Sequence, residues 1–109
     1  MDRPVPFNFT RTVRTVSSES YTIFEDDEPV GQVDIHFGQG TGYATLILTR
    51  VLGEDRISEL VATIDDQLVS CVLPPFDRLD FVTSVYHGTE LDRYGDPTPD
   101  EDLGTDNGN

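Results

Sequence analysis

The feature that most constrains the fold is a change in the spacing of apolar residues near Glu54. Before this point, short segments alternate apolar and polar residues, which is the period of a half-buried strand. After it, apolar residues recur every three or four positions and form one stripe along a helix, at Ile57, Leu60, Val61, Ile64 and Leu68. The chain therefore predicts several strands followed by a helix that covers one face of their sheet.

Four segments before Glu54 have the composition and alternation of strands. We expect them at residues 7–16, 21–24, 31–37 and 43–50. Residues 25–29 are acidic and contain a proline, and residues 38–42 hold three glycines, so both segments favour turns. Because these connections are short, we expect an antiparallel meander.

The second part of the chain predicts one helix and one more strand. The helix is expected from residue 54 to about residue 69, and the last strand at residues 79–86. The order β-β-β-β-α-β describes an α+β domain, with a small antiparallel sheet and one helix packed on one face. Asp65 and Asp66 fall in the last turns of this helix with no Lys or Arg beside them, which opposes the helix dipole.

Charge divides the chain into two parts. Its 109 residues include 21 Asp and Glu, seven Arg and no Lys, and the formal net charge is −14. Residues 88–109 hold seven of the acids among Gly and Pro, with few large apolar side chains, and such a segment cannot offset its ordering entropy. We expect one domain over residues 1–89 and a disordered acidic tail over residues 90–109. A core of that size is marginal in stability, and dimerisation would stabilise it.

The acidity also restricts the classes of partner. Nucleic-acid phosphates and anionic membranes both attract clustered Lys and Arg, so we expect no direct nucleic-acid and no membrane partner. The N-terminus lacks a basic segment followed by an apolar one, and Cys71 is the single cysteine, set among apolar residues. These features predict a reduced, cytoplasmic protein in which this thiol is buried.

Three explanations of the acidity remain open. An excess of Asp over Glu and the absence of Lys suit adaptation to high salt, where repulsion between acids is screened. An acidic surface also suits a basic partner, or imitation of nucleic-acid phosphate to inhibit a DNA-binding protein. A GC-rich genome explains the missing Lys but not the surplus of acids. Mimicry ranks lower because nearly half of the net charge falls in the expected tail rather than in ordered rows.

Asp34 and His36 are the most suggestive pair for chemistry. Two positions apart on a strand, they project from the same face, and a carboxylate can orient an imidazole or raise its pKa. A solvated strand face produces the same spacing, and no nucleophile or third ligand follows at a recognisable distance. We therefore assign no catalytic residue, no metal ligand and no cofactor, although the class of the protein stays open between enzyme and non-enzyme.

The outward face of the sheet is the candidate site. Neighbouring strands are expected to bring hydroxyl and apolar side chains to this face, which suits a solvated sheet and equally a dimer or partner surface. The candidate ligand or partner residues are Arg14, Asp34, His36, Tyr43, Thr45 and Ile47.

Residues 21–37, residues 43–50 and the following helix resemble the central strands and helix of GNAT-type acetyltransferases. The resemblance covers less than half of the chain. It implies that acetyl-CoA would be bound by an Arg/Gln-x-x-Gly-x-Gly/Ala loop between strand and helix. Here that position reads Arg50-Val51-Leu52-Gly53-Glu54-Asp55, with one Gly where two small residues are expected and two acids at the phosphate position. This departure removes the chemistry, so no functional residue is carried over from that family.

These observations favour a small non-enzymatic protein that acts through protein–protein contact, as a homodimer or as an accessory subunit. One alternative is a small-molecule-binding or enzymatic domain that uses the open sheet face around His36. Another is an acidic nucleic-acid mimic that inhibits a DNA-binding protein.

Overall fold

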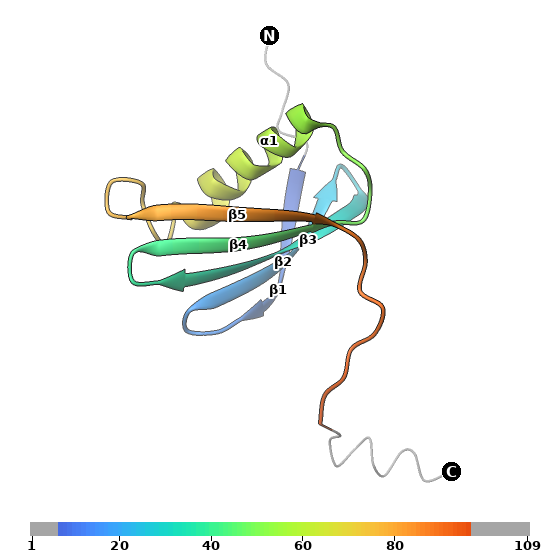
Figure 1. The fold of residues 1–109 in the computed structure, drawn as a ribbon, viewed down its shortest axis with the longest axis horizontal. Coiled ribbons are helices and arrows are strands. Elements are labelled where there is room, and N and C mark those ends of the chain that lie inside the picture. Colours follow the sequence, from blue (N-terminus) through green and yellow to red (C-terminus); the bar gives the residue numbers. More distant parts are fainter. Residues whose placement is uncertain (1–6, 97–109) are drawn as a thin grey trace.

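A computed structural model describes residues 7–96, and residues 1–6 and 97–109 lie outside the described part. The α+β class is confirmed, with a five-stranded sheet and one main helix (Figure 1). The elements follow the chain in this order: β1 (Phe7–Arg14), β2 (Ser18–Glu25), β3 (Glu28–Gly38), β4 (Thr41–Leu48), α1 (Glu54–Ile64), the short π-helical segment η1 (Asp65–Val69) and β5 (Asp80–His87).

The sheet is mixed rather than wholly antiparallel. Its strand order is β1-β2-β3-β4-β5, and the first four strands form an antiparallel meander. β5 pairs with β4 in parallel, from Thr41 opposite Asp80 to Leu48 opposite His87. The expectation of an antiparallel sheet is therefore wrong for β5. The physical reason is the connection: α1 and the loop after it return the chain to the end where β4 begins, so β5 runs in the same direction.

Two tight turns set the register of the meander. Gln39 and Gly40, between β3 and β4, both have positive φ angles of 41° and 87°. That conformation matches the twist of the flanking strands. Asp26, between β2 and β3, has a φ of 57°. Both predicted turns are confirmed, and they place β3 and β4 at the centre of the sheet.

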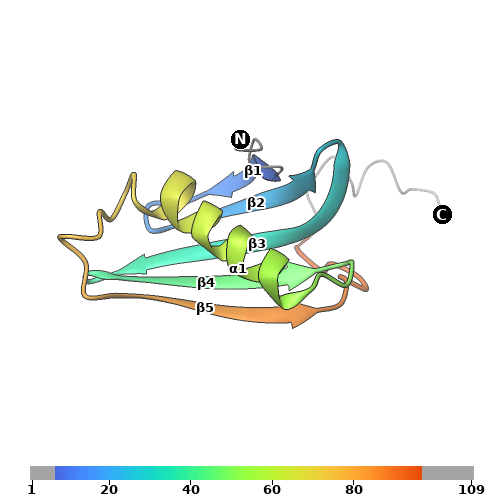
Figure 2. The same cartoon turned by 90° about the horizontal axis from the view of Figure 1, so that it is seen from above.

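α1 covers one face of the sheet (Figure 2). Leu60 and Ile64 point from the helix into the core and are fully buried. The sheet side of the core consists of Phe7, Tyr21, Ile23, Val30, Val33, Ile35, Ala44, Leu46 and Leu48. The opposite face has no helix over it within the described residues, so one sheet face stays open.

The C-terminal end of the helix is stabilised by a cation from a distant part of the sequence. Arg78, in the loop before β5, donates two hydrogen bonds to Asp65, of 2.7 and 2.9 Å. These hydrogen bonds lower the pKa of the Asp65 carboxyl below its ordinary value. The expectation that Asp65 lacks a cationic partner is thus wrong, because a local pattern does not show a contact 13 residues away.

Two further expectations concern exposure. Cys71 is exposed, with its Sγ 3.5 Å from the Gln67 carbonyl, so the expectation of a buried thiol is wrong. Residues 88–96 contain neither helix nor strand and are exposed, and the rest of the predicted tail, residues 97–109, lies outside the described part. No helix within residues 7–96 has the length and apolar character needed to cross a membrane.

Candidate functional site

Five of the six predicted site residues lie together on the open face. The register places His36 opposite Tyr43, Asp34 opposite Thr45, and Ile47 opposite Gln32. Directly opposite residues of an antiparallel pair share a face, so these side chains form one surface across β3 and β4. His36 and Tyr43 are exposed, and the other three are half-buried.

Arg14 is the exception, and it lies on the α1 side of the sheet. A β-bulge between Arg11 and Val13 shifts the register, and Arg14 then pairs with Glu19. Its Nε lies 3.7 Å from a carboxylate oxygen of Glu19, which is buried. One extra residue in a strand moves the following side chains to the other face. Sequence alternation alone does not reveal such an insertion, and Val13 takes the open-face position instead.

The Glu19 carboxylate on the α1 side is held by a second partner, Tyr21. The Tyr21 hydroxyl donates a hydrogen bond to Glu19. Burial, and then this hydrogen bond, raise the pKa of Tyr21 above its ordinary value. Arg14 and Tyr21 together compensate the buried charge of Glu19, so these three side chains stabilise β2.

Asp34 and His36 do not act as a pair. Asp34 accepts a hydrogen bond of 3.1 Å from the Gln32 side-chain amide, and no hydrogen bond joins it to His36 within the described residues. His36 stands exposed on the sheet and lines none of the three hollows described below. No group of three His, Cys, Asp or Glu side chains in residues 7–96 is arranged to hold a metal ion.

Two open hollows of about 410 and 440 Å³ lie on this face, where the segment after β5 meets the sheet. The first includes Ile47 and Gln32 with Thr89 and Glu90, and the second includes Asp34 and Val13 with Arg93. Arg93 is paired with Glu90 at 2.9 Å. The surface of the first hollow is mostly apolar, with threonine hydroxyls, the Gln32 amide and Glu90 among its lining. The second hollow is mostly polar and includes Asp34 and the paired Arg93, so neither lining provides a reactive centre.

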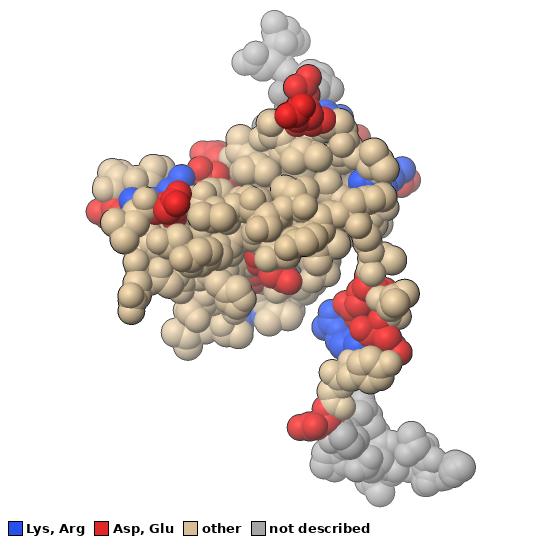
Figure 3. All heavy atoms as spheres, in the orientation of Figure 1, with Lys and Arg blue, Asp and Glu red and all other residues tan. Residues whose placement is uncertain are grey.

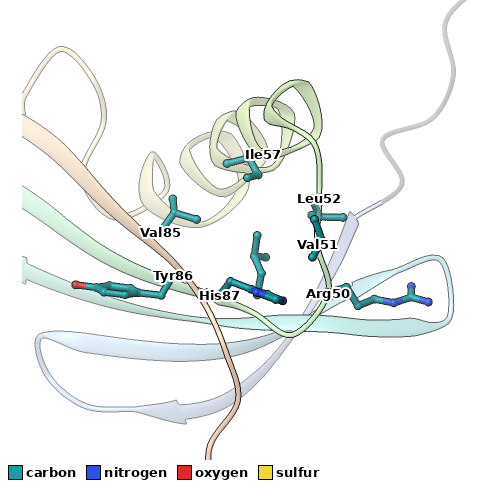
Figure 4. A pocket seen from close by; sticks show the side chains of 8 residues that line it. Arg50, Val51, Leu52, Ile57, Val85, Tyr86 and His87 are labelled. Carbon is teal, nitrogen blue, oxygen red and sulfur yellow. The ribbon is translucent and has the colours of Figure 1, made fainter.

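A smaller hollow of about 220 Å³ lies on the α1 side, where the ends of β4 and β5 meet the start of the helix. Figure 4 shows Leu52, Ile57 and Val85 converging there from the loop, the helix and β5, while Arg50 and Tyr86 extend away. Arg50 forms an ion pair with Glu28 at the start of β3, and its Nη2 lies 3.5 Å from a Glu28 carboxylate oxygen. The hollow is therefore mostly apolar, lined by Leu48, Arg50, Val51, Leu52, Ile57, Val85, Tyr86 and His87.

The free edge of β5 is the feature that the sequence interpretation missed. β5 is an outer strand of the sheet, and six consecutive uncharged residues, 81–86, follow Asp80 in it. Val82, Val85 and Tyr86 are 42%, 41% and 58% exposed. Figure 2 shows α1 crossing the sheet diagonally, with its start near the ends of β4 and β5 and the rest of the helix over the inner strands, and Figure 3 shows a mostly uncharged surface over β5 with charged side chains towards its margins.

The backbone of β5 offers unpaired hydrogen-bonding groups along this edge. The Gly88 N–H donates to the Leu48 carbonyl of β4 at 2.9 Å. Backbone groups alternate in direction along a strand, so the even-numbered residues of β5 bond to β4. The N–H and C=O groups of Phe81, Thr83 and Val85 consequently point outward, where another strand can pair with them.

The other outer strand, β1, is protected against the addition of a further strand. It carries Arg11 and Arg14 and the bulge between Arg11 and Val13, and charges and bulges both discourage strand addition. β5 pairs with β4 in continuous register and has no charged side chain between Asp80 and His87. The two edges of one sheet therefore differ sharply in their capacity to accept a partner.

The chain matches no protein-family model, and neither a curated protein nor a solved structure is significantly similar to it.

Proposed function

We propose that the chain is a non-enzymatic protein-interaction module, a homodimer or an accessory subunit, and that the β5 edge is its contact surface. The observation that carries this proposal is the open edge of β5 with its uncharged run, residues 81–86. Main-chain hydrogen bonds to an edge strand provide affinity, and the side chains beside it provide specificity.

Charge supports the choice of this surface over the rest of the molecule. The chain has a net charge of −14, whereas the middle of β5 has no charged residue. Exposed Val85 and Tyr86 line the small apolar hollow, and exposed Val82 lies further along the same strand, so apolar area and free backbone groups occur together. Exposed apolar surface of this kind is typical of interaction sites.

The enzymatic alternative around His36 has no support from the geometry. That idea requires a concave site at the imidazole, but His36 is exposed and has no described hydrogen bond to Asp34. The adjacent hollows include Asp34 and threonines but no nucleophile with a neighbouring base.

Photo-crosslinking tests the proposal. We would replace Tyr86 by benzoylphenylalanine and irradiate the cells that naturally make the protein. Val16, which is fully exposed in the β1–β2 turn, provides the control position. We expect a covalent adduct from position 86 and none from position 16. A folded chain that forms no adduct at position 86 contradicts the proposal.

A truncation separates the β5 edge from the acidic tail. Removing residues 90–109 takes away seven acids and Arg93 but leaves β5 whole. We expect the adduct at position 86 to persist in this shortened chain. Loss of the adduct would assign the binding to the tail instead.

A further inference from the structure

We infer that the partner of β5 is a second copy of this chain. The two β5 strands would pair antiparallel about a two-fold axis at Ser84, so that one sheet continues through both copies. This inference rests on the proposed role of β5 as the contact surface, and it adds the identity of the partner. A two-fold contact requires a surface that is complementary to itself, and β5 has this property in its shape, its backbone and its charge.

The two ends of β5 have complementary shapes, with exposed apolar side chains at one end and an apolar hollow at the other. At its start, Leu79 is 82% exposed and Phe81 is partly buried on the α1 side. At its far end lies the apolar hollow of about 220 Å³, lined in part by Val85 and His87. Antiparallel pairing places the start of one strand beside the end of the other. The apolar side chains of each copy then lie next to the hollow of its partner copy.

The backbone of β5 permits this register. With Ser84 opposite Ser84 of the second copy, Thr83 lies opposite Val85, and both have outward N–H and C=O groups. Val82 then lies opposite Tyr86, which forms a β-branched and aromatic pair on the open face. Phe81 lies opposite His87, on the α1 side and beside the hollow.

Charge favours this surface for self-association. Residues 81–86 bring no charge to the contact, and Asp80 falls opposite Gly88 rather than another acid. The remaining repulsion between two chains of net charge −14 acts through solvent, where salt screens it. The dimer should therefore become tighter as salt increases. Binding of a basic partner to the acidic surface would show the opposite dependence.

Sedimentation equilibrium of the full chain with Cys71→Ser tests the inference, since that exposed thiol could cross-link by itself. One added strand is a small interface, so we expect a roughly micromolar dissociation constant. We expect it to fall at least about threefold between 0.05 and 1 M NaCl as screening increases.

Matched edge variants locate the contact. Val82→Lys places a charge on β5, and Val13→Lys places one on β1. The two sites are similarly exposed, since Val82 is 42% and Val13 is 47% exposed. We expect Val82→Lys to weaken the dimer at least about tenfold, because a charged edge residue opposes strand pairing, and Val13→Lys to leave it unchanged. A monomer at 200 μM in 1 M NaCl overturns the inference, as does equal weakening by both variants.

A cysteine at the two-fold axis tests the register without depending on Val82→Lys. Ser84→Cys, in the Cys71→Ser chain, brings two thiols to the close Cα separation of a non-hydrogen-bonded antiparallel pair, which a disulfide can span. His36→Cys, also exposed on the open face, is the control. We expect mild oxidation to give a covalent dimer with Ser84→Cys and none with His36→Cys. Failure at Ser84, or equal yields at both positions, overturns the inference.

The crosslinking from position 86 keeps this inference separate from the proposed function. An adduct with twice the mass of the chain supports both. An adduct with a different protein overturns the second copy as partner but leaves β5 as the contact surface. No adduct from position 86 contradicts both.

Discussion

The ion pair between Asp65 and Arg78 joins the end of the helical region to the start of β5. Its two hydrogen bonds measure 2.7 and 2.9 Å, and the two side chains are 30% and 14% exposed. We expect Asp65→Asn to lower the free energy of unfolding by about 1–3 kcal/mol at pH 7, because a charged hydrogen-bonded partner of Arg78 is lost. Asp66→Asn, at the exposed neighbouring position, should change it by less than about 0.5 kcal/mol. Urea denaturation measures both, and equal effects would contradict a specific role for the pair.

The same pair predicts a pH dependence. Arg78 lowers the pKa of Asp65 below its ordinary value of 3.8, so the unfolded chain binds this proton more readily than the folded chain. The stabilisation is complete above pH 3.8 and disappears as the pH falls through the lower folded value. We therefore expect the difference between the native chain and Asp65→Asn to be constant near neutrality and to shrink below pH 3.8. A difference that grows in acid would contradict this assignment.

Gly31 lies where the backbones of β3 and β4 approach closely. A Cβ atom at this position would lie 2.4 Å from the Ile47 carbonyl oxygen. We expect Gly31→Ala to cost about 1–3 kcal/mol, because the neighbouring backbone must move. Gly38→Ala is the control, since nothing lies within 4 Å of its Cβ position. Thermal denaturation should separate the two variants clearly, and equal melting temperatures would contradict the close approach.

Individual residues limit what the sequence can predict. Alternation placed Asp34, His36, Tyr43, Thr45 and Ile47 on one face, because a regular strand has a period of two. It failed at Arg14, where a bulge inserts one residue, and at Cys71, whose exposure depends on how the chain leaves η1. Neither event has a signal in local hydrophobic spacing.

At the scale of the elements, α1 illustrates which contacts stabilise the sheet. Leu60 is fully buried at the middle of the helix, whereas Ser58 is exposed on its outer face. We expect Leu60→Ala to lower the free energy of unfolding by about 2–5 kcal/mol, because it leaves a cavity between helix and sheet. Ser58→Ala should change it little or stabilise the helix slightly. Comparable losses from both would contradict the predicted orientation of the helix.

The class of each element follows from periodicity, but the direction of the last strand does not. The spacing of apolar residues distinguishes four strands from the helix near Glu54. The sequence of residues 80–87 does not predict that β5 pairs with β4 or that this pairing is parallel. That arrangement depends on the path of α1 across the sheet, which is a property of the connection and not of the strand itself.

At the scale of the whole molecule, the distribution of charge matters more than its total. The net charge of −14 marks the chain as acidic, yet β5 holds an uncharged stretch on an open edge. The sequence predicted an interaction surface on the open face but not the edge, since a strand becomes an edge only through the order of the sheet. The small apolar hollow beside β5 likewise combines two segments far apart in sequence, residues 48–57 and 85–87.

Amide hydrogen exchange along β5 measures directly whether this edge is an interface. The amides of residues 82, 84 and 86 face β4 and should be protected at every protein concentration. The amides of Phe81, Thr83 and Val85 face outward, so we expect fast exchange in dilute protein and at least tenfold slower exchange in concentrated protein, where a second strand pairs with them. Fast exchange of these three amides in protein at several hundred micromolar and 1 M NaCl would contradict pairing at the β5 edge.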